Sequence, residues 1–192
     1  MTTTLPAPLS TYRAPPTYSR DVLGFALLFA QLAFTVWIIP DWSPSHLAEP
    51  PFLAGISGIA VTLAILMLRF TGRRGSRLER GVLAVFLGGM PLIYVASWLL
   101  APQPGWLAIE LLAVPVFGTL AVLGVRRSPW FLAAGIAAHG LAWDLWHHGR
   151  TTFIPDWYVV GCCGVDLALA AYVALEVPRF LRNGAPDREL AA

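Results

Sequence analysis

The sequence predicts an all-α fold: a polytopic membrane bundle of six transmembrane helices, with both termini inside (N-in and C-in). Three observations carry this prediction. Hydrophobic residues make up 57% of the 192 residues, and charged residues make up only 12%. Six apolar runs have the length of about 20 residues that a hydrocarbon core about 30 Å thick requires of a helix. These runs are continuous, which argues against a transmembrane β-barrel, whose strands alternate apolar and polar residues.

The expected spans are separated by short loops and leave room for one domain. They cover residues 20–39, 51–70, 81–100, 105–125, 129–148 and 157–178. The transmembrane domain is therefore expected over residues 20–180. Residues 1–19 are rich in Pro, Thr and Ser and have no apolar centre, so we expect a disordered cytoplasmic tail there. Residues 181–192 are expected to form a second cytoplasmic tail.

Arginine alone determines the expected orientation, because the chain contains no lysine. The arginines precede the first span, follow the last, or lie in the loops after the second and fourth spans, whereas Arg150 is alone on the other side. The positive-inside rule then places both termini in the cytoplasm. We expect a multi-pass protein of a bacterial cytoplasmic (inner) membrane. Its basic segment 69–80, "RFTGRRGSRLER", is expected to contact anionic membrane lipid, and nothing supports a nucleic-acid partner.

Ionisable side chains gather in the fourth, fifth and sixth expected spans. At a rise of about 1.5 Å per residue, His139 and Asp166 both lie roughly 12 to 13 Å below the outer surface. Asp144, Cys162 and Glu110 are expected nearer that surface. Because a short loop joins the fifth and sixth spans, these spans are expected to be antiparallel neighbours. One site can therefore collect these side chains.

An ionisable group inside a membrane costs about 3 kcal/mol, so such a cluster favours a functional site. We expect an integral membrane enzyme with an outward-opening His/Asp site. It would perform acid–base chemistry, as an isomerase or cyclase does, on a lipid-soluble, isoprenoid-like substrate. Asp144, Asp166 and Glu110 would be the acids, and His139 the base or the orienting group.

Aromatic residues supply the expected walls of the substrate pocket. Most of the tryptophans fall at the outer ends of spans, as in an aromatic belt. Trp143 and Trp146 bracket Asp144, and they are the expected members of a pocket for a lipophilic small molecule.

Other functions also fit these residues. A transition metal such as Zn, Fe or Cu could be bound by His139, His147, Asp144 and Cys162, whereas the acid–base enzyme would need no cofactor. A proton-coupled small transporter would use His139 and Asp166 as a relay. An accessory membrane subunit would use the same pair only to fix helix packing.

The stretches "HGLAWDLWHH" and "IPDWYVVGCCGVD" carry a histidine, an aspartate, a histidine pair, a Pro-x-Trp-Tyr turn, and then Cys and Asp. In this order they resemble small bacterial multi-spanning membrane proteins of unknown activity. The resemblance covers the last two expected spans. It implies a six-helix membrane bundle and assigns no catalytic role to any residue.

Overall fold

The structure is a computed structural model that describes residues 18–39, 44–46 and 48–183. Within these ranges the chain is all-α and contains no strand. The two expected tails lie outside the described residues, except that residues 18–19 and 181–183 belong to the first and last helices.

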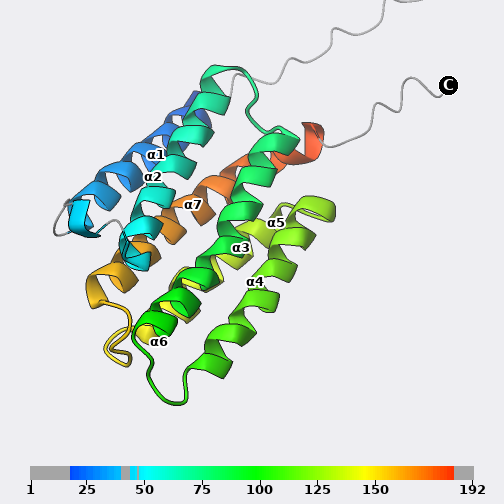
Figure 1. Cartoon of the computed structure of the whole chain (residues 1–192). Coiled ribbons are helices and arrows are strands. Elements are labelled where there is room, and N and C mark those ends of the chain that lie inside the picture. Colours follow the sequence, from blue (N-terminus) through cyan, green and yellow to red (C-terminus); the bar gives the residue numbers. More distant parts are fainter. Residues whose placement is uncertain (1–17, 40–43, 47, 184–192) are drawn as a thin grey trace, which may run out of the picture.

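Helices follow one another through short connections (Figure 1). In chain order they are α1 (Tyr18–Ile38), η1 (Pro44–His46), α2 (Pro50–Phe70), α3 (Arg77–Leu100), α4 (Leu107–Arg126), α5 (Trp130–Ala138), η2 (His139–Asp144), α6 (Leu145–His147) and α7 (Asp156–Asn183). Helix α2 begins with a proline. The first N–H groups of a helix have no acceptor within the helix, so the N–H that proline lacks is not needed there. Ser76 caps α3 by accepting a hydrogen bond from the backbone N–H of Glu79 at 3.2 Å.

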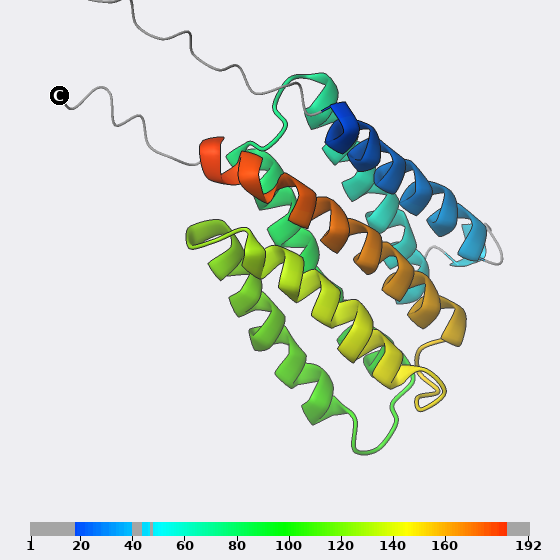
Figure 2. The ribbon, with the colours of Figure 1, turned by 180° about the vertical axis from the view of Figure 1, so that it is seen from behind.

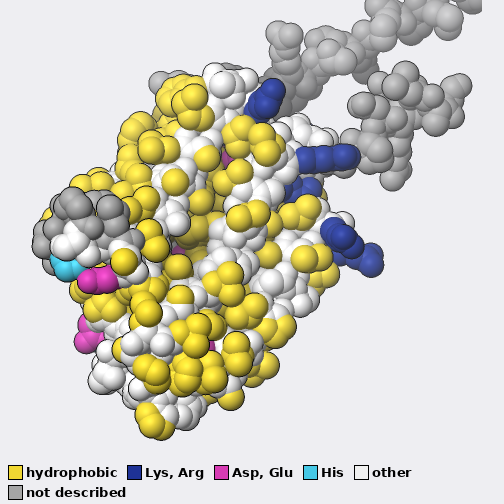
Figure 3. Space-filling model, in the orientation of Figure 1, with side chains coloured by type: hydrophobic (Ala, Val, Ile, Leu, Met, Phe, Trp, Pro, Cys, Tyr) yellow, Lys and Arg dark blue, Asp and Glu magenta, His cyan; other side chains and the backbone are white. Residues whose placement is uncertain are grey.

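Five of the described helices are long and apolar enough to cross a membrane, namely α1, α2, α3, α4 and α7. Their outward faces are apolar, and Trp37, Phe70, Val85 and Leu100 are each at least 70% exposed. Hydrophobic side chains cover much of the face seen in Figure 3. An apolar surface of this extent is typical of a protein surrounded by lipid rather than by water. The chain is therefore a membrane protein.

The stretch expected as the fifth span is helical but irregular. From Trp130 to His147, α5, η2 and α6 follow one another without a break, and η2 is a π-helix. None of the three segments alone is long enough to cross a membrane. In a π-helix the hydrogen bonds join residue i to residue i+5, and single π-turns inside α-helices are frequent at functional sites.

Helix α7 lies at the centre of the bundle. It contacts α1, α2, α3, α5, η2 and α6. Figure 2 shows α1 and α2 on one side of α7, and α5 and α4 on the other. Leu169 and Val173 of α7 are fully buried in the main core. Polar side chains on α7 can therefore meet partners from most of the other helices.

Gly140 allows η2 to approach α7 closely. A Cβ atom at this position would lie 2.9 Å from the Cβ of Asp166 and 3.3 Å from the carbonyl oxygen of Cys163. Glycine is therefore the residue that fits here, because any side chain would push the two helices apart.

Candidate functional site

Four side chains from η2 and α7 converge inside the bundle. His139, Asp144, Cys162 and Asp166 each offer one ligand atom, and these atoms all lie within 4.8 Å of one another. The histidine and both aspartates are fully buried, whereas Cys162 is half-buried. We call these four residues the His–Asp centre.

One imidazole nitrogen faces both carboxylates of the centre. His139 Nδ1 lies 2.8 Å from Asp166 Oδ2 and 3.4 Å from Asp144 Oδ1. The hydroxyl of Tyr94, on α3, donates a hydrogen bond of 2.7 Å to Asp144 Oδ1. Three helical segments, η2, α3 and α7, therefore position the charged groups of the centre.

The π-helical geometry of η2 brings His139 and Asp144 together. In a regular α-helix, residues five apart point about 140° away from each other. The π-helical hydrogen-bond pattern instead places residues five apart on the same face. The sequence predicts Asp144 nearer the outer surface than His139 but within reach of one site, and the structure brings Asp144 Oδ1 to 3.4 Å from His139 Nδ1. Both residues belong to one centre.

Three polar atoms of the centre are buried without a hydrogen-bond partner. They are His139 Nε2, Asp144 Oδ2 and Asp166 Oδ1. Buried polar atoms in proteins are nearly always paired, and an unpaired one costs free energy. Three such atoms in one cluster are available to form hydrogen bonds or coordinate bonds with a ligand.

Glu110 and His147 form a separate buried pair. His147 Nε2 lies 2.8 Å from Glu110 Oε1, and its Nδ1 lies 2.8 Å from the backbone oxygen of Trp143. A carbonyl oxygen can only accept, so Nδ1 carries a proton. A hydrogen bond between Nε2 and Glu110 Oε1 needs one further proton, which is carried either by the imidazole or by the carboxyl group. The structure does not bring either residue into the His–Asp centre.

Trp143 and Trp146, the expected pocket walls, pack around His147. Their ring centroids lie 5.0 and 5.1 Å from that of His147. Tyr94 is closer still, with its ring centroid 4.5 Å from that of His147. These aromatic rings enclose the imidazole and keep water from it.

An apolar cavity lies instead between α1, α2, α3 and α7, with a volume of about 260 Å³. Its wall includes Ile39, Val61, Met90, Trp157, Tyr158 and Cys162. Because Cys162 also belongs to the His–Asp centre, the cavity and the centre are in direct contact. Neither Trp143 nor Trp146 is part of the wall.

Tyr94 and Tyr158 are functional candidates that the sequence analysis missed. Tyr94 binds Asp144, and Tyr158 lines the cavity together with Cys162. Each is a tyrosine inside an apolar span, where its hydroxyl requires a polar partner. That requirement is the signal in the sequence that could have identified them.

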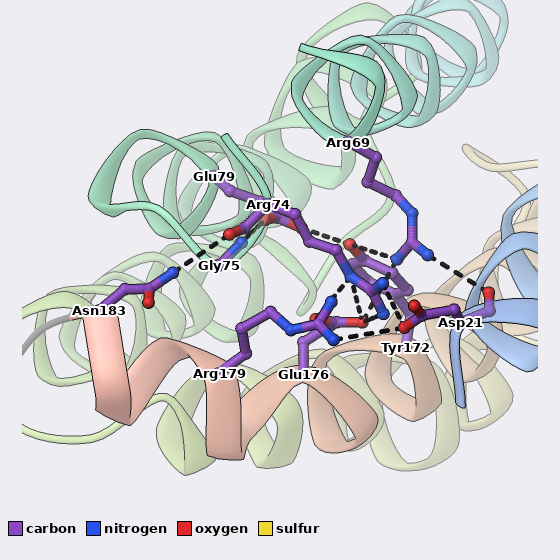
Figure 4. Close-up of polar contacts among 9 residues, drawn as sticks. All are labelled: Asp21, Arg69, Arg74, Gly75, Glu79, Tyr172, Glu176, Arg179 and Asn183. Atoms are coloured by element: carbon purple, nitrogen blue, oxygen red, sulfur yellow. Dashed lines mark hydrogen bonds and ion pairs between the residues drawn. The ribbon is translucent and has the colours of Figure 1, made fainter. Parts of the chain in front are cut away.

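A second buried polar cluster joins α1, α2, α3 and α7 at the arginine-rich end of the bundle (Figure 4). We call it the arginine–acid network; it consists of Asp21, Arg69, Arg74, Glu79, Tyr172, Glu176 and Arg179. Arg69 Nη1 lies 3.3 Å from Glu176 Oε1, and Arg179 Nη2 lies 3.3 Å from Asp21 Oδ1. Arg74 pairs with both Glu176 and Asp21.

Part of the basic segment 69–80 is thus directed into the protein rather than towards lipid. Burial acts to lower the pKa of Arg74, but its hydrogen bonds and ion pairs with Glu176 and Asp21 outweigh burial and raise that pKa above its ordinary value. Arg74 is therefore a permanent cation of the network.

Comparison of the chain with family models, curated proteins and solved structures finds no match.

Proposed function

We propose that the chain crosses a bacterial inner membrane six times with both termini in the cytoplasm, and that α5, η2 and α6 together form the fifth span. At about 1.5 Å per residue, the stretch from Trp130 to His147 extends roughly 27 Å, close to the thickness of the hydrocarbon core. Arginine side chains gather at one end of the molecule (Figure 3), as the positive-inside rule requires of the cytoplasmic side.

Within this domain, the His–Asp centre is proposed to bind one transition-metal ion. The observation that carries this proposal is the convergence of four ligand atoms within 4.8 Å. Ligands held at about 2.0 to 2.3 Å from one zinc ion lie roughly 3.3 to 3.7 Å from each other in a tetrahedral site. One imidazole nitrogen, one thiolate and two carboxylate oxygens form a donor set suited to zinc or iron.

The surroundings of the centre also fit a metal site. Asp144 is held by the hydroxyl of Tyr94, and ligating carboxylates are commonly fixed by such outer hydrogen bonds. The imidazole, if charged, provides one positive charge against two carboxylates and a thiol. This excess of acidic groups favours a cation.

The adjoining cavity supports an enzymatic role on a lipid-soluble substrate. Its wall is largely apolar, and one of its few polar side chains, Cys162, belongs to the His–Asp centre. A metal ion in the centre would polarise an oxygen of a substrate bound there. Helices α1, α2, α3 and α7 would exclude water from that substrate.

A second candidate is acid–base catalysis without a metal. The observation that favours it is the 2.8 Å hydrogen bond between His139 Nδ1 and Asp166 Oδ2, with Asp144 and Tyr94 continuing the chain of contacts. Such a chain can hold and transfer a proton, with His139 as base and an aspartic acid as donor. Glu110 would act only on His147.

Metal binding by the full chain, purified in detergent without chelators, tests the first proposal. We expect about one equivalent of zinc or iron by mass spectrometry, and an affinity at least about tenfold lower in Cys162→Ser. Cys163→Ser is the matched control, because Cys163 is the neighbouring cysteine and is not part of the centre. Equal metal content in the two variants would contradict the assignment of Cys162. A wild-type protein that binds no metal would favour the acid–base candidate.

A further inference from the structure

A second cavity, with a volume of about 460 Å³, opens where the N-terminal end of α3 meets the C-terminal ends of α4 and α7. Four arginines line it: Arg77 and Arg80 from α3, and Arg126 and Arg127 from the end of α4. This cavity differs from the one beside the His–Asp centre, because its wall is strongly basic.

Among the described residues, the four arginines carry positive charge without a matching acid. In the part of the chain that the structure describes, no carboxylate forms an ion pair with any of them. By contrast Arg69, Arg74 and Arg179, which lie at the same end, all have acidic partners. Like charges gathered around one cavity repel each other, and an anion bound between them would remove that repulsion.

Arg80 is held in place at this cavity by the end of α4. It is only 9% exposed, and its Nη2 donates hydrogen bonds of 2.7 Å to the backbone oxygens of Gly124 and Val125. Its Nε is buried and has no hydrogen-bond partner. This N–H group is an unused donor on a buried side chain that lines the cavity.

The rest of the wall is apolar and continues onto the outer surface. Phe180 is fully buried, whereas Leu181 is 51% exposed and Val125 is 41% exposed. A ligand with a phosphate group and a hydrocarbon tail would match both parts of this site. Guanidinium groups bind phosphate oxygens through paired hydrogen bonds, and basic pockets between spans bind anionic lipid head groups.

We infer that the cavity lined by Arg77, Arg80, Arg126 and Arg127 binds the phosphate group of an anionic phospholipid. This inference is independent of the metal site, since the cavity and the His–Asp centre share no residue. A specific site of this kind differs from the general attraction of arginines to an anionic membrane, because binding depends on these particular side chains.

Two double variants with the same change in charge test the inference. Arg126→Gln/Arg127→Gln removes two exposed arginines of the cavity and keeps Arg80, which is bound to α4. Arg73→Gln/Arg182→Gln removes two exposed arginines at the same end that do not line the cavity. Size-exclusion chromatography in detergent would establish that both variants are folded.

The probe is a short-chain phosphatidylglycerol, titrated against the full chain in detergent at fixed salt, with binding followed by tryptophan fluorescence. Each basic residue contributes roughly a factor of five to the attraction of anionic lipid, so the cavity variant should bind about 25-fold more weakly. The control variant should bind within about twofold of the wild type, because screening weakens charges outside the cavity. Short-chain phosphatidylcholine should bind weakly to all three proteins.

A second titration uses inorganic phosphate and distinguishes a phospholipid ligand from a free phosphate ion. Weak binding of phosphate beside tight binding of the lipid supports the phospholipid. Phosphate that binds as tightly as the lipid, and is lost in the cavity variant, would overturn the lipid and assign the cavity to a free anion. Equal lipid binding by the two double variants would overturn the site itself.

Discussion

Helix α7 carries two buried polar clusters, and they differ in how their charges are balanced. In the arginine–acid network, Arg69, Arg74 and Arg179 lie opposite Asp21 and Glu176, and each makes at least one ion pair. In the His–Asp centre a single imidazole faces two carboxylates, and three polar atoms have no partner. In the first cluster every arginine has an acidic partner and Arg69 Nε alone among its buried side-chain polar atoms lacks a hydrogen bond, whereas the second cluster leaves three such atoms and an excess of carboxylates.

This difference separates a structural role from a functional one. A buried ion pair that loses one partner leaves an uncompensated charge, which strongly destabilises the fold. A centre that already holds an excess of acidic groups is under electrostatic strain, and removing one of them relieves part of it. We therefore expect the network to control stability and the His–Asp centre to control activity.

Glu176→Gln should have the largest effect. The change leaves Arg69 and Arg74 facing a neutral amide in a nearly dry environment, since Glu176 is only 2% exposed. We expect the free energy of unfolding to fall by about 3 kcal/mol, measured by denaturation in detergent. Glu49→Gln, at a carboxylate with 55% side-chain exposure, is the control and should be near neutral. Equal stability of the two variants would show that the network does not hold the helices together.

Gly140→Ala should have the second-largest effect on stability, and it should also lower metal affinity. The new methyl group would press on Asp166 and on the backbone of Cys163, and overpacking of this kind costs about 2 kcal/mol. It would also separate η2 from α7, so we expect metal affinity to fall with stability. Gly118→Ala in α4, where a Cβ meets no atom within 4 Å, should be neutral or stabilising. Unchanged metal binding in Gly140→Ala would mean that the close approach is not needed by the centre.

Asp166→Asn should leave stability nearly unchanged while it weakens metal binding. The amide keeps an oxygen for His139 and removes one charge from an acidic cluster, so the free energy of unfolding should change by less than about 1 kcal/mol. Metal affinity should fall at least about tenfold in the same preparation. A loss of stability as large as that of Glu176→Gln would contradict the distinction between the two clusters.

Glu110→Gln should have the smallest effect on stability. Hydrogen bonds between membrane helices contribute about 0.6 kcal/mol on average, and the glutamine amide can still contact His147. Metal content should stay at the wild-type level, because Glu110 is outside the His–Asp centre. Loss of metal in this variant would extend the centre to the pair of Glu110 and His147.

The sequence predicts the helices well, because continuous apolar runs leave few alternatives in a membrane. The second expected span, 51–70, corresponds to α2 at Pro50–Phe70. Depth along the helices also predicts that His139 and Asp166 meet, and their hydrogen bond confirms it. The count of six spans stays a prediction, because η2 divides the fifth.

Two features could not be predicted from residue spacing. The π-helical turn that joins Asp144 to His139 is one of them, because residue spacing is interpreted on a regular α-helix; Gly140, within this turn, packs closely against α7. The network depends on tertiary pairing of Arg74 with Asp21, which is 53 positions away. The positive-inside rule uses loop arginines only to orient the chain in the membrane, so it does not predict their ion pairs with buried acids.

X-ray absorption at the metal edge of the purified, metal-loaded protein tests the central claim most directly. The His–Asp centre predicts one sulfur ligand at about 2.3 Å together with nitrogen and oxygen ligands at about 2.0 to 2.2 Å. The sulfur contribution should disappear in Cys162→Ser and persist in Cys163→Ser. A shell of oxygen and nitrogen alone in the wild-type protein, unchanged in Cys162→Ser, would contradict a metal bound by the His–Asp centre.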